Sequence, residues 1–552
     1  MTWAFGRSNI ARLLKTTEPG TVRRLLFVTA LAGLANALLL GLINIAAASA
    51  AAARPLAARV FIAYLVIVVV YFLANRASLH GANDLLQRRL MELRVRVAEK
   101  VRHSDLRALE RIGRHEIYAT LVQETNYLAQ NFPILVGAAQ SLFLVLFSLL
   151  YIATLSLISF AVIAFFAVTG LLYFRSRRSR LDAEMSAVHV DEAAMIGSLT
   201  NFTDGFQEIR LNADKNDSLF RRFVAIVDAL EAAIVSIGRQ WVVLVVFSNA
   251  FLYILLGLVV LALPYLFTGE TAVVYKIVTA VIFCVGPISG MTLVAHIYAR
   301  ADVGLGHVYR LEERLEQGAS TDVSAPELPA TSFRDFRTIR LERISFHYED
   351  AQGDVSFEVG PWDIELRRGE MVFLRGGNGS GKSTVLKLMC GLYRPMAGRI
   401  TVDGVAVGHA TAQEYRELFS SVFTDFHLFD RLYGLDDVSP QDVRALIERM
   451  ELSGKVDFVD GRFSTLDLST GQRKRLAMIA SLLENREVYV FDEWAADQDA
   501  HFRDVFYTEL LPELKRLGKT IVAVTHDDRY WHVSDRLITL DLGEIVSAEG
   551  QG

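Results

Sequence analysis

The chain has 552 residues, of which 52% are hydrophobic, and a formal net charge of −5. This length allows more than one domain, and the apolar content exceeds that of ordinary soluble proteins, so part of the chain is expected to lie in lipid. The charge provides no basic field for nucleic acid, and the two cysteines, Cys284 and Cys390, are too few for a disulfide framework or a four-thiolate metal site.

Residues 1–315 contain six apolar stretches close to the roughly 20 residues that cross a bilayer. The predicted spans are approximately residues 22–48, 56–74, 133–151, 152–174, 241–263 and 273–297. Long polar stretches rich in arginine follow the second and fourth spans, so the positive-inside rule places them, and both termini, in the cytoplasm. We therefore expect an all-α, six-helix membrane domain with long cytoplasmic helical extensions.

A linker and a second domain follow the last span. Residues 316–335 are rich in Ala, Ser, Thr and Pro, which is typical of a linker. From residue 336 to 552 short β-type runs alternate with helical patterns, and polar loops follow the runs at 371–374, 488–491 and 521–524. Open α/β sheets bind ligands at the carboxyl ends of their strands, so a ligand site is expected there.

The first of these loops has the composition of a phosphate-binding loop. It comprises Gly376, Gly377, Asn378, Gly379, Ser380, Gly381, Lys382, Ser383 and Thr384, between a strand-like and a helix-like segment. Glycines at a helix start let backbone N–H groups point at phosphate oxygens, Lys382 adds a positive charge, and Ser383 offers a Mg²⁺ ligand. The chain is therefore expected to bind a nucleoside triphosphate, and we predict ATP with Mg²⁺.

The run Val488–Phe491 is followed by two carboxylates. A nucleotidase needs one carboxylate near the metal and one that accepts a proton from water. We assign the first role to Asp492 and the second to Glu493. The alternative is a strand followed by solvated acids.

The run Ser469, Thr470, Gly471 and Gln472 opens a helical pattern between these two motifs. By itself it reads as a helix N-cap. In this order the three motifs resemble the nucleotide-binding domain of ATP-binding cassette (ABC) transporters, and six spans before one such domain is the half-transporter layout of the family's exporters. The resemblance thus covers essentially the whole chain.

The resemblance implies further roles. Residues 469–472 resemble the signature loop, which binds the ATP held by the partner subunit. Tyr348 stands where the family has an adenine-stacking aromatic, and His526 resembles the switch histidine that contacts the γ-phosphate. Asp497 and Asp499 fall in the dimer-contact loop (D-loop), although its usual Ser-Ala-Leu-Asp is replaced by Ala-Asp-Gln-Asp.

The chain departs from the family at the Q-loop. Thr424 occupies the position of the usual glutamine, followed by Asp425. A threonine hydroxyl is shorter than a glutamine amide, so Thr424 or Asp425 would reach Mg²⁺ through water. The segment between Thr424 and the signature helix is also short, which suggests a trimmed helical subdomain.

The runs 423–429, 468–476 and 492–499 resemble those of the cyclic-peptide and siderophore-peptide exporter subfamily, including pyoverdine-type and lasso-peptide exporters. This resemblance implies a location in a bacterial inner membrane. The expected function is ATP-driven export of a cyclic or modified peptide by a homodimer, with a heterodimer as the alternative. A lipid flippase, a metal-chelate importer and a slow nucleotide-gated regulator or channel remain alternatives on the same fold.

Coupling and cargo contacts are the least defined expectations. By resemblance, turns near Asp105, Arg210 and Asp214 dock on the nucleotide domains, although a solvated turn would show the same charges. For the cargo we name His296, together with Asn36, Asn44 and Asn249, because polar groups in apolar spans tend to face a cavity or another helix. Helix–helix hydrogen bonding is an equal alternative for each asparagine.

Overall fold

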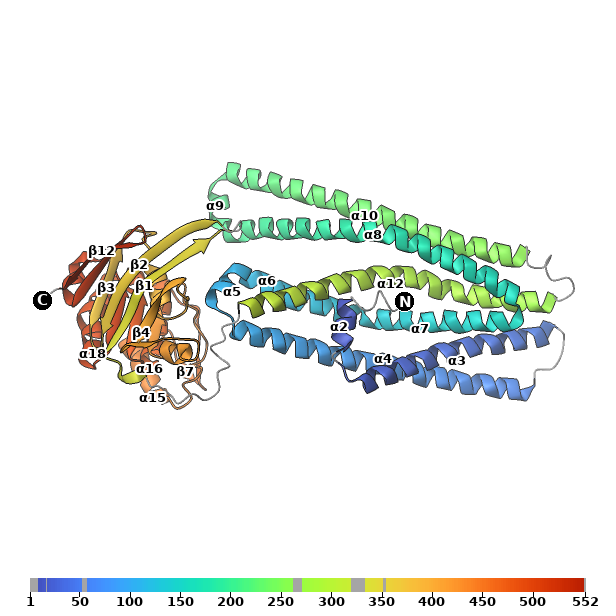
Figure 1. Cartoon of the computed structure of the whole chain (residues 1–552), viewed down its shortest axis with the longest axis horizontal. Coiled ribbons are helices and arrows are strands. Elements are labelled where there is room, and N and C mark those ends of the chain that lie inside the picture. Colours follow the sequence, from blue (N-terminus) through green and yellow to red (C-terminus); the bar gives the residue numbers. More distant parts are fainter. Residues whose placement is uncertain are drawn as a thin grey trace. The chain divides into compact units, whose positions relative to one another are not determined.

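The computed structural model describes residues 8–15, 17–51, 57–261, 271–318, 333–350 and 354–550. It divides into two compact units (Figure 1). The first comprises Met1–Ala98 and Arg114–Glu313, and the second comprises Glu99–Gly113 and Arg314–Gly552. A short segment from the first half of the chain, residues 99–113, therefore belongs to the same unit as the C-terminal domain.

The first unit is helical, and most of its described residues lie in long helices. Its helices are α2 (Asn9–Lys15), α3 (Pro19–Ala51), α4 (Ala58–Arg102), α6 (Arg114–Ala119), the π-helix η1 (Thr120–Glu124), α7 (Thr125–Leu155), α8 (Leu157–Asp204), α9 (Phe206–Leu211), α10 (Ala213–Leu261) and α12 (Thr271–Gln317). Helices α4, α8, α10 and α12 have 45, 48, 49 and 47 residues. Each is about 70 Å long, which is more than twice the hydrocarbon thickness of a bilayer. Each helix therefore has room for a membrane-crossing part and an extension in water.

Within the described residues, five helical segments are long and apolar enough to cross a membrane. They are Pro19–Ala47, Ala58–Arg102, Glu116–Leu155, Ala213–Leu261 and Val273–Met291, and Leu157–Gly170 is a shorter apolar helix. In sequence order α3 packs on α7, and α8 packs on both α7 and α10. The predicted helical N-terminal domain with several apolar helices is confirmed.

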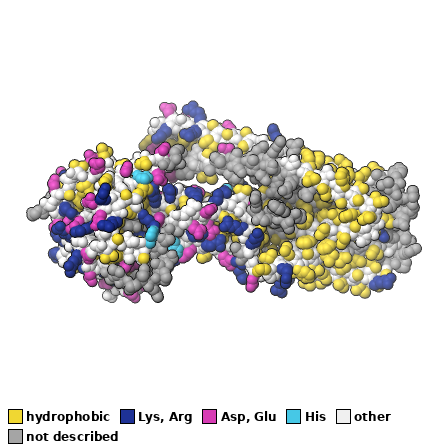
Figure 2. All heavy atoms as spheres, viewed as in Figure 1, with side chains coloured by type: hydrophobic (Ala, Val, Ile, Leu, Met, Phe, Trp, Pro, Cys, Tyr) yellow, Lys and Arg dark blue, Asp and Glu magenta, His cyan; other side chains and the backbone are white. Residues whose placement is uncertain are grey.

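Helix α4 shows how one helix serves two environments. In its first half Phe61, Val66 and Phe72 are more than half exposed, as expected of side chains that face lipid. In its second half Leu90, Leu93 and further residues at spacings of three and four form a fully buried stripe on a polar helix. Figure 2 shows the exposed apolar side chains of this unit as a broad surface at one of its ends.

The second unit is built on two larger sheets and a small hairpin. One sheet has the order β2-β1-β4-β5, the other the order β12-β11-β3-β10-β9-β6, and β7 pairs with β8. The strands are β1 (Thr338–Glu349), β2 (Val355–Arg367), β3 (Met371–Gly376), β4 (Ala397–Val402), β5 (Val405–Ala406), β6 (Phe419–Val422), β7 (Phe458–Val459), β8 (Arg462–Phe463), β9 (Val488–Asp492), β10 (Thr520–Val524), β11 (Arg536–Asp541) and β12 (Glu544–Gly550). Strands β11, β3, β10, β9 and β6 run parallel, so their carboxyl ends meet at one edge.

The remaining elements of this unit are mostly helical. They are α5 (Leu106–Ile112), η3 (Phe333–Asp335), α13 (Lys382–Met389), α14 (Ala412–Arg416), α15 (Pro440–Arg449), α16 (Thr470–Glu484), η4 (Trp494–Asp497), α17 (Ala500–Val505), η5 (Phe506–Leu510), α18 (Leu511–Arg516) and η6 (Asp528–Val533). Between β6 and α16 the chain forms only α15 and the β7–β8 hairpin. The expected α/β P-loop domain is confirmed.

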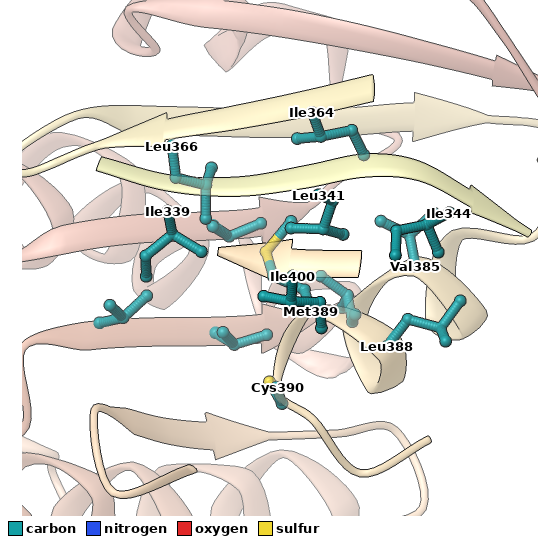
Figure 3. Packing of buried hydrophobic residues seen from close by; sticks show 14 of the residues in the cluster. Ile339, Leu341, Ile344, Ile364, Leu366, Val385, Leu388, Met389, Cys390 and Ile400 are labelled. Atoms are coloured by element: carbon teal, nitrogen blue, oxygen red, sulfur yellow. The ribbon is translucent and has the colours of Figure 1, made fainter. Parts of the chain in front are cut away.

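The core of this unit fixes the helix that follows the phosphate-binding loop. Val385, Leu388 and Met389 of α13 pack against Ile339, Leu341 and Ile344 of β1 and their neighbours on β2 and β4 (Figure 3). Cys390 is buried in the same cluster, and burial raises the pKa of its thiol. Helix α13 thus lies between the two sheets, and its N-terminus is held at the carboxyl edge of the parallel strands.

Candidate nucleotide-binding site

The loop between β3 and α13 is shaped by glycines. Gly379 and Gly381 have φ angles of 79° and 92°, which are in the left-handed region. At Gly376 a Cβ atom would lie 2.3 Å from the carbonyl oxygen of Leu540. Only glycines therefore allow the loop to wrap tightly before α13 begins at Lys382.

Lys382 and Ser380 point into this loop. The Lys382 side chain is buried and donates from Nζ to the carbonyl oxygens of Gly376 and Gly377, at 3.0 and 2.9 Å. Ser380 Oγ is buried and has no hydrogen-bond partner among the described residues. A cation held by carbonyls, an unused hydroxyl and the N-terminus of α13 form a preorganised receptor for phosphate oxygens.

Strand β9 brings a carboxylate to the same edge. All five residues of β9 are buried, including Asp492, which is 3% exposed. Burial raises the pKa of Asp492; hydrogen bonds from Ser383 and Thr424 oppose this, and the neighbouring Glu493 adds to it. Asp492 Oδ1 has no hydrogen-bond partner within the described part of the chain.

This carboxylate and Ser383 fit a magnesium ion. Mg²⁺ prefers oxygen ligands and takes few of them from protein, because phosphates and water complete its shell. In the described ranges no group of three or more His, Cys, Asp and Glu residues could hold a metal. A metal here would therefore share its coordination between Asp492, Ser383 and the nucleotide.

Glu493 and His526 are joined directly. Glu493 Oε1 accepts a hydrogen bond from His526 Nε2 at 2.9 Å, and the side chains are 32% and 47% exposed. The backbone of Glu493 is left-handed, with φ 49° and ψ 38°, which turns its side chain out of the strand direction. A cavity of about 350 Å³ lies beside this pair, lined also by Tyr507, Thr525 and Asp527. The arrangement leaves a solvent-accessible carboxylate and imidazole next to the buried Asp492.

Thr424 reaches the same edge and bonds both to the carboxylate and to the backbone of Asp492. Its Oγ1 donates to the carbonyl oxygen of Asp492 at 3.2 Å, and the side chain of Asp425 is exposed. Strand β6 carries Thr424 beside β9, so the Q-loop position lies close to the carboxylate that fits a metal.

Tyr348 contacts the first turn of α13. Its hydroxyl is 3.1 Å from Thr384 Oγ1, and its ring packs with Phe346, Phe357 and Tyr393. The half-buried ring is thus attached to the helix that carries the phosphate-binding loop.

The signature residues form a separate group. Ser469 Oγ and the side chain of Gln472 make a capping box at the start of α16, while Thr470 is exposed. A Cβ atom at Gly471 would lie 2.6 Å from the carbonyl oxygen of Asp497. The signature start therefore packs on the D-loop, and Asp499 receives a bond from Arg475 Nη2 at 2.7 Å.

Helix α5 follows Asp105, near which a docking turn was expected, and it contacts residues of the nucleotide domain. Asp105 lies 3.6 Å from Arg394, and Glu110 accepts from Lys387 Nζ at 3.0 Å and from Tyr393 Oη at 2.5 Å. Arg107 also pairs with Glu349 at 3.4 Å and stacks on Phe346. The individual partners could not be predicted, because residues more than 200 positions away leave no local pattern.

The other predicted contact residues lie in the first unit. Arg210 on α9 and Asp214 on α10 are exposed. Asn44 Nδ2 donates to the carbonyl oxygen of Lys276 at 3.4 Å, and Asn249 Oδ1 accepts from Ser289 Oγ at 2.8 Å, so both bond to another helix. Asn36 is half-buried in α3. His296 belongs to α12, but its side chain lies outside the described residues.

Comparisons with known proteins agree with this geometry. Residues 359–496 match the family model described as ABC transporter. The chain is 32% identical over 502 residues to the ATP-binding protein SyrD of Pseudomonas syringae pv. syringae, a match that covers 87% of this chain and 86% of that protein. It is 31% identical over 208 residues to the macrolide export ATP-binding/permease protein MacB of Vibrio parahaemolyticus, covering 35% and 32%.

A solved structure extends the likeness to the whole fold. It is described as a bacterial Atm1-family ABC exporter with ATP bound, and it matches with a TM-score of 0.76 over 97% of this chain and 96% of that chain. At 17% identity this match concerns the fold. The order of a helical membrane domain and an α/β P-loop domain is thus that of an exporter.

Proposed function

Because this chain belongs to the ABC transporter family, in which ATP hydrolysis is coupled to transport, we propose that two copies form an exporter of cyclic or otherwise modified peptides. The exporter fold supports the direction, and the motifs around Thr424, Ser469 and Asp492 support the cargo class through their resemblance to peptide and siderophore-peptide exporters. We place it in a bacterial inner membrane, because it resembles bacterial peptide exporters. Both termini are placed in the cytoplasm, because arginines cluster in the stretches after the second and fourth predicted spans.

The pairing of Glu493 with His526 carries the catalytic part of the proposal. Loop amides and Lys382 bind the phosphates of ATP, and Glu493 accepts a proton from the attacking water. His526, 2.9 Å from Glu493, orients that carboxylate. Its contact with the γ-phosphate is inferred from the resemblance to the switch histidine of the family. Ser383 and Asp492 would hold Mg²⁺, which would supply positive charge next to the phosphates.

The proposal of a dimer rests on the separation of the signature residues from the phosphate-binding loop within one chain. Residues 469–472 contact the start of α16 and residues 497–498, while Lys382 bonds to its own loop. A signature loop that meets a second copy completes the ATP site by placing a helix N-terminus against the γ-phosphate. Each chain holds both halves, so a homodimer forms two equivalent sites.

Transport into inverted vesicles tests the proposal. Vesicles that contain the full chain receive a fluorescent cyclic peptide, with Lys382→Ala as the inactive control. ATP-dependent accumulation with wild type alone is expected. ATPase activity without peptide movement, but with transbilayer movement of a labelled lipid, would replace the cargo assignment by a flippase. Slow hydrolysis with neither movement would favour a regulator, for which the Thr424 bond to the Asp492 backbone gives a physical reason.

A further inference from the structure

A buried lysine in the signature helix connects the two halves of the site. Lys474 is 1% exposed, although lysine is rarely buried unless it is paired. Its Nζ donates to the backbone carbonyl oxygen of Glu493 at 2.8 Å and pairs with Asp497 Oδ2 at 2.7 Å. One ammonium group therefore holds the backbone of the proposed base and the D-loop that follows it.

Neighbouring contacts make this connection rigid. Trp494, fully buried, donates from Nε1 to the carbonyl oxygen of Lys474 at 3.0 Å. Gln498 Nε2 donates to the carbonyl oxygen of Gly471 at 3.1 Å. The first two turns of α16 and residues 493–498 are thus fixed to each other by these four contacts.

The bond to Glu493 is the part with a consequence for catalysis. Glu493 has a left-handed backbone, which non-glycine residues rarely adopt without support from their surroundings. The carbonyl that Lys474 binds belongs to the same residue whose carboxylate meets His526. Asp497, by contrast, has a side chain that is 44% exposed and can be hydrated without Lys474.

We infer that Lys474 is a positioning residue, which fixes the backbone of Glu493 so that its carboxylate is aimed at the attacking water. This inference rests on the proposed function of Glu493. Lys474 lies on α16, whose start is proposed to bind the ATP of the partner. Its bond to Glu493 therefore joins the base of one ATP site of the dimer to the signature residues of the other. A misplaced base lowers the rate of the chemical step and leaves the affinity for nucleotide nearly unchanged.

Steady-state ATP hydrolysis by the full chain in lipid nanodiscs tests this role. We expect Lys474→Met to lower kcat by roughly 10- to 100-fold with KM for ATP changed less than about twofold. Lys474→Gln keeps a donor for the Glu493 carbonyl and is expected to recover part of the loss. Asp497→Asn removes only the ion pair and is expected to have a smaller effect. Lys455→Met, at an exposed lysine of the same unit, is the matched control.

A double variant separates positioning from general damage. If Lys474 acts through Glu493, adding Lys474→Met to Glu493→Gln lowers the residual rate by less than about twofold. An equal loss in both backgrounds would overturn the inference, as would a wild-type kcat for Lys474→Met. If Lys474→Met does not fold, Lys474→Gln in both backgrounds gives the same comparison. A wild-type rate for Glu493→Gln alone would instead refute the proposed base.

Discussion

The contact between α5 and the nucleotide domain predicts a measurable change in local stability. Glu110 accepts two hydrogen bonds, from Lys387 Nζ and Tyr393 Oη, and replacing it by glutamine removes the charge from both. A hydrogen bond to a charged group stabilises a protein by about 1 kcal/mol more than a neutral one. The Glu110 side chain is 38% exposed, so solvent screens part of this contribution. We therefore expect a total loss of about 1–2 kcal/mol in the docking of α5.

Hydrogen exchange of the full chain in nanodiscs measures this loss. For amides of Leu106–Ile112 that exchange through local opening of α5, a loss of about 1–2 kcal/mol makes exchange roughly 5- to 30-fold faster. Arg111→Gln, on the exposed side of the same helix, is the control and leaves exchange within about twofold. Equal exchange in Glu110→Gln and wild type would show that these bonds do not hold α5.

Three further predictions concern hydrolysis, coupling and stability. Glu493→Gln is expected to lower kcat by roughly 10²- to 10⁴-fold without loss of ATP binding, measured by phosphate release and nucleotide titration; undiminished turnover would exclude Glu493 as the base. Arg210→Ala should keep ATPase activity and reduce peptide accumulation, whereas wild-type transport would remove this residue from coupling. Asp499 caps α17, and Asp499→Ala is expected to lower the melting temperature by about 2–4 °C at pH 7. The backbone bond from Phe502 and the charge of Arg475 hold the pKa of Asp499 below its ordinary value. The difference in melting temperature between wild type and Asp499→Ala should therefore shrink as the pH falls below about 4 and Asp499 is protonated. A difference that stays constant with pH would contradict a cap that depends on the charge.

Local motifs allowed the fold and the nucleotide site to be predicted. The run from Gly376 to Thr384 follows a strand and opens a helix, and each of these features depends on residues that are adjacent in sequence. The alternation of short apolar runs with helical patterns likewise indicated an α/β domain. ABC transporter membership and the exporter fold were confirmed by the comparisons.

Contacts between distant segments could not be predicted. The run Arg473-Lys474-Arg475 has the appearance of a solvated charge cluster, yet Lys474 is buried because the D-loop folds over it. Glu110 likewise meets Tyr393, which is 283 positions away. In the membrane domain, the sequence could not show whether an asparagine faces a cavity or bonds to another helix. In the structure Asn44 and Asn249 bond to neighbouring helices.

Mixing two inactive variants is the most direct test of an ATP site shared between two copies. Lys382→Ala disables one half of the site and Ser469→Arg the other, so each homodimer is expected to be inactive. Random pairing at equal amounts gives heterodimers with one intact site, and about a quarter of wild-type ATPase activity should return. Chain exchange is verified by cross-linking. No recovery despite exchange, or full activity from a monomer, would contradict the account.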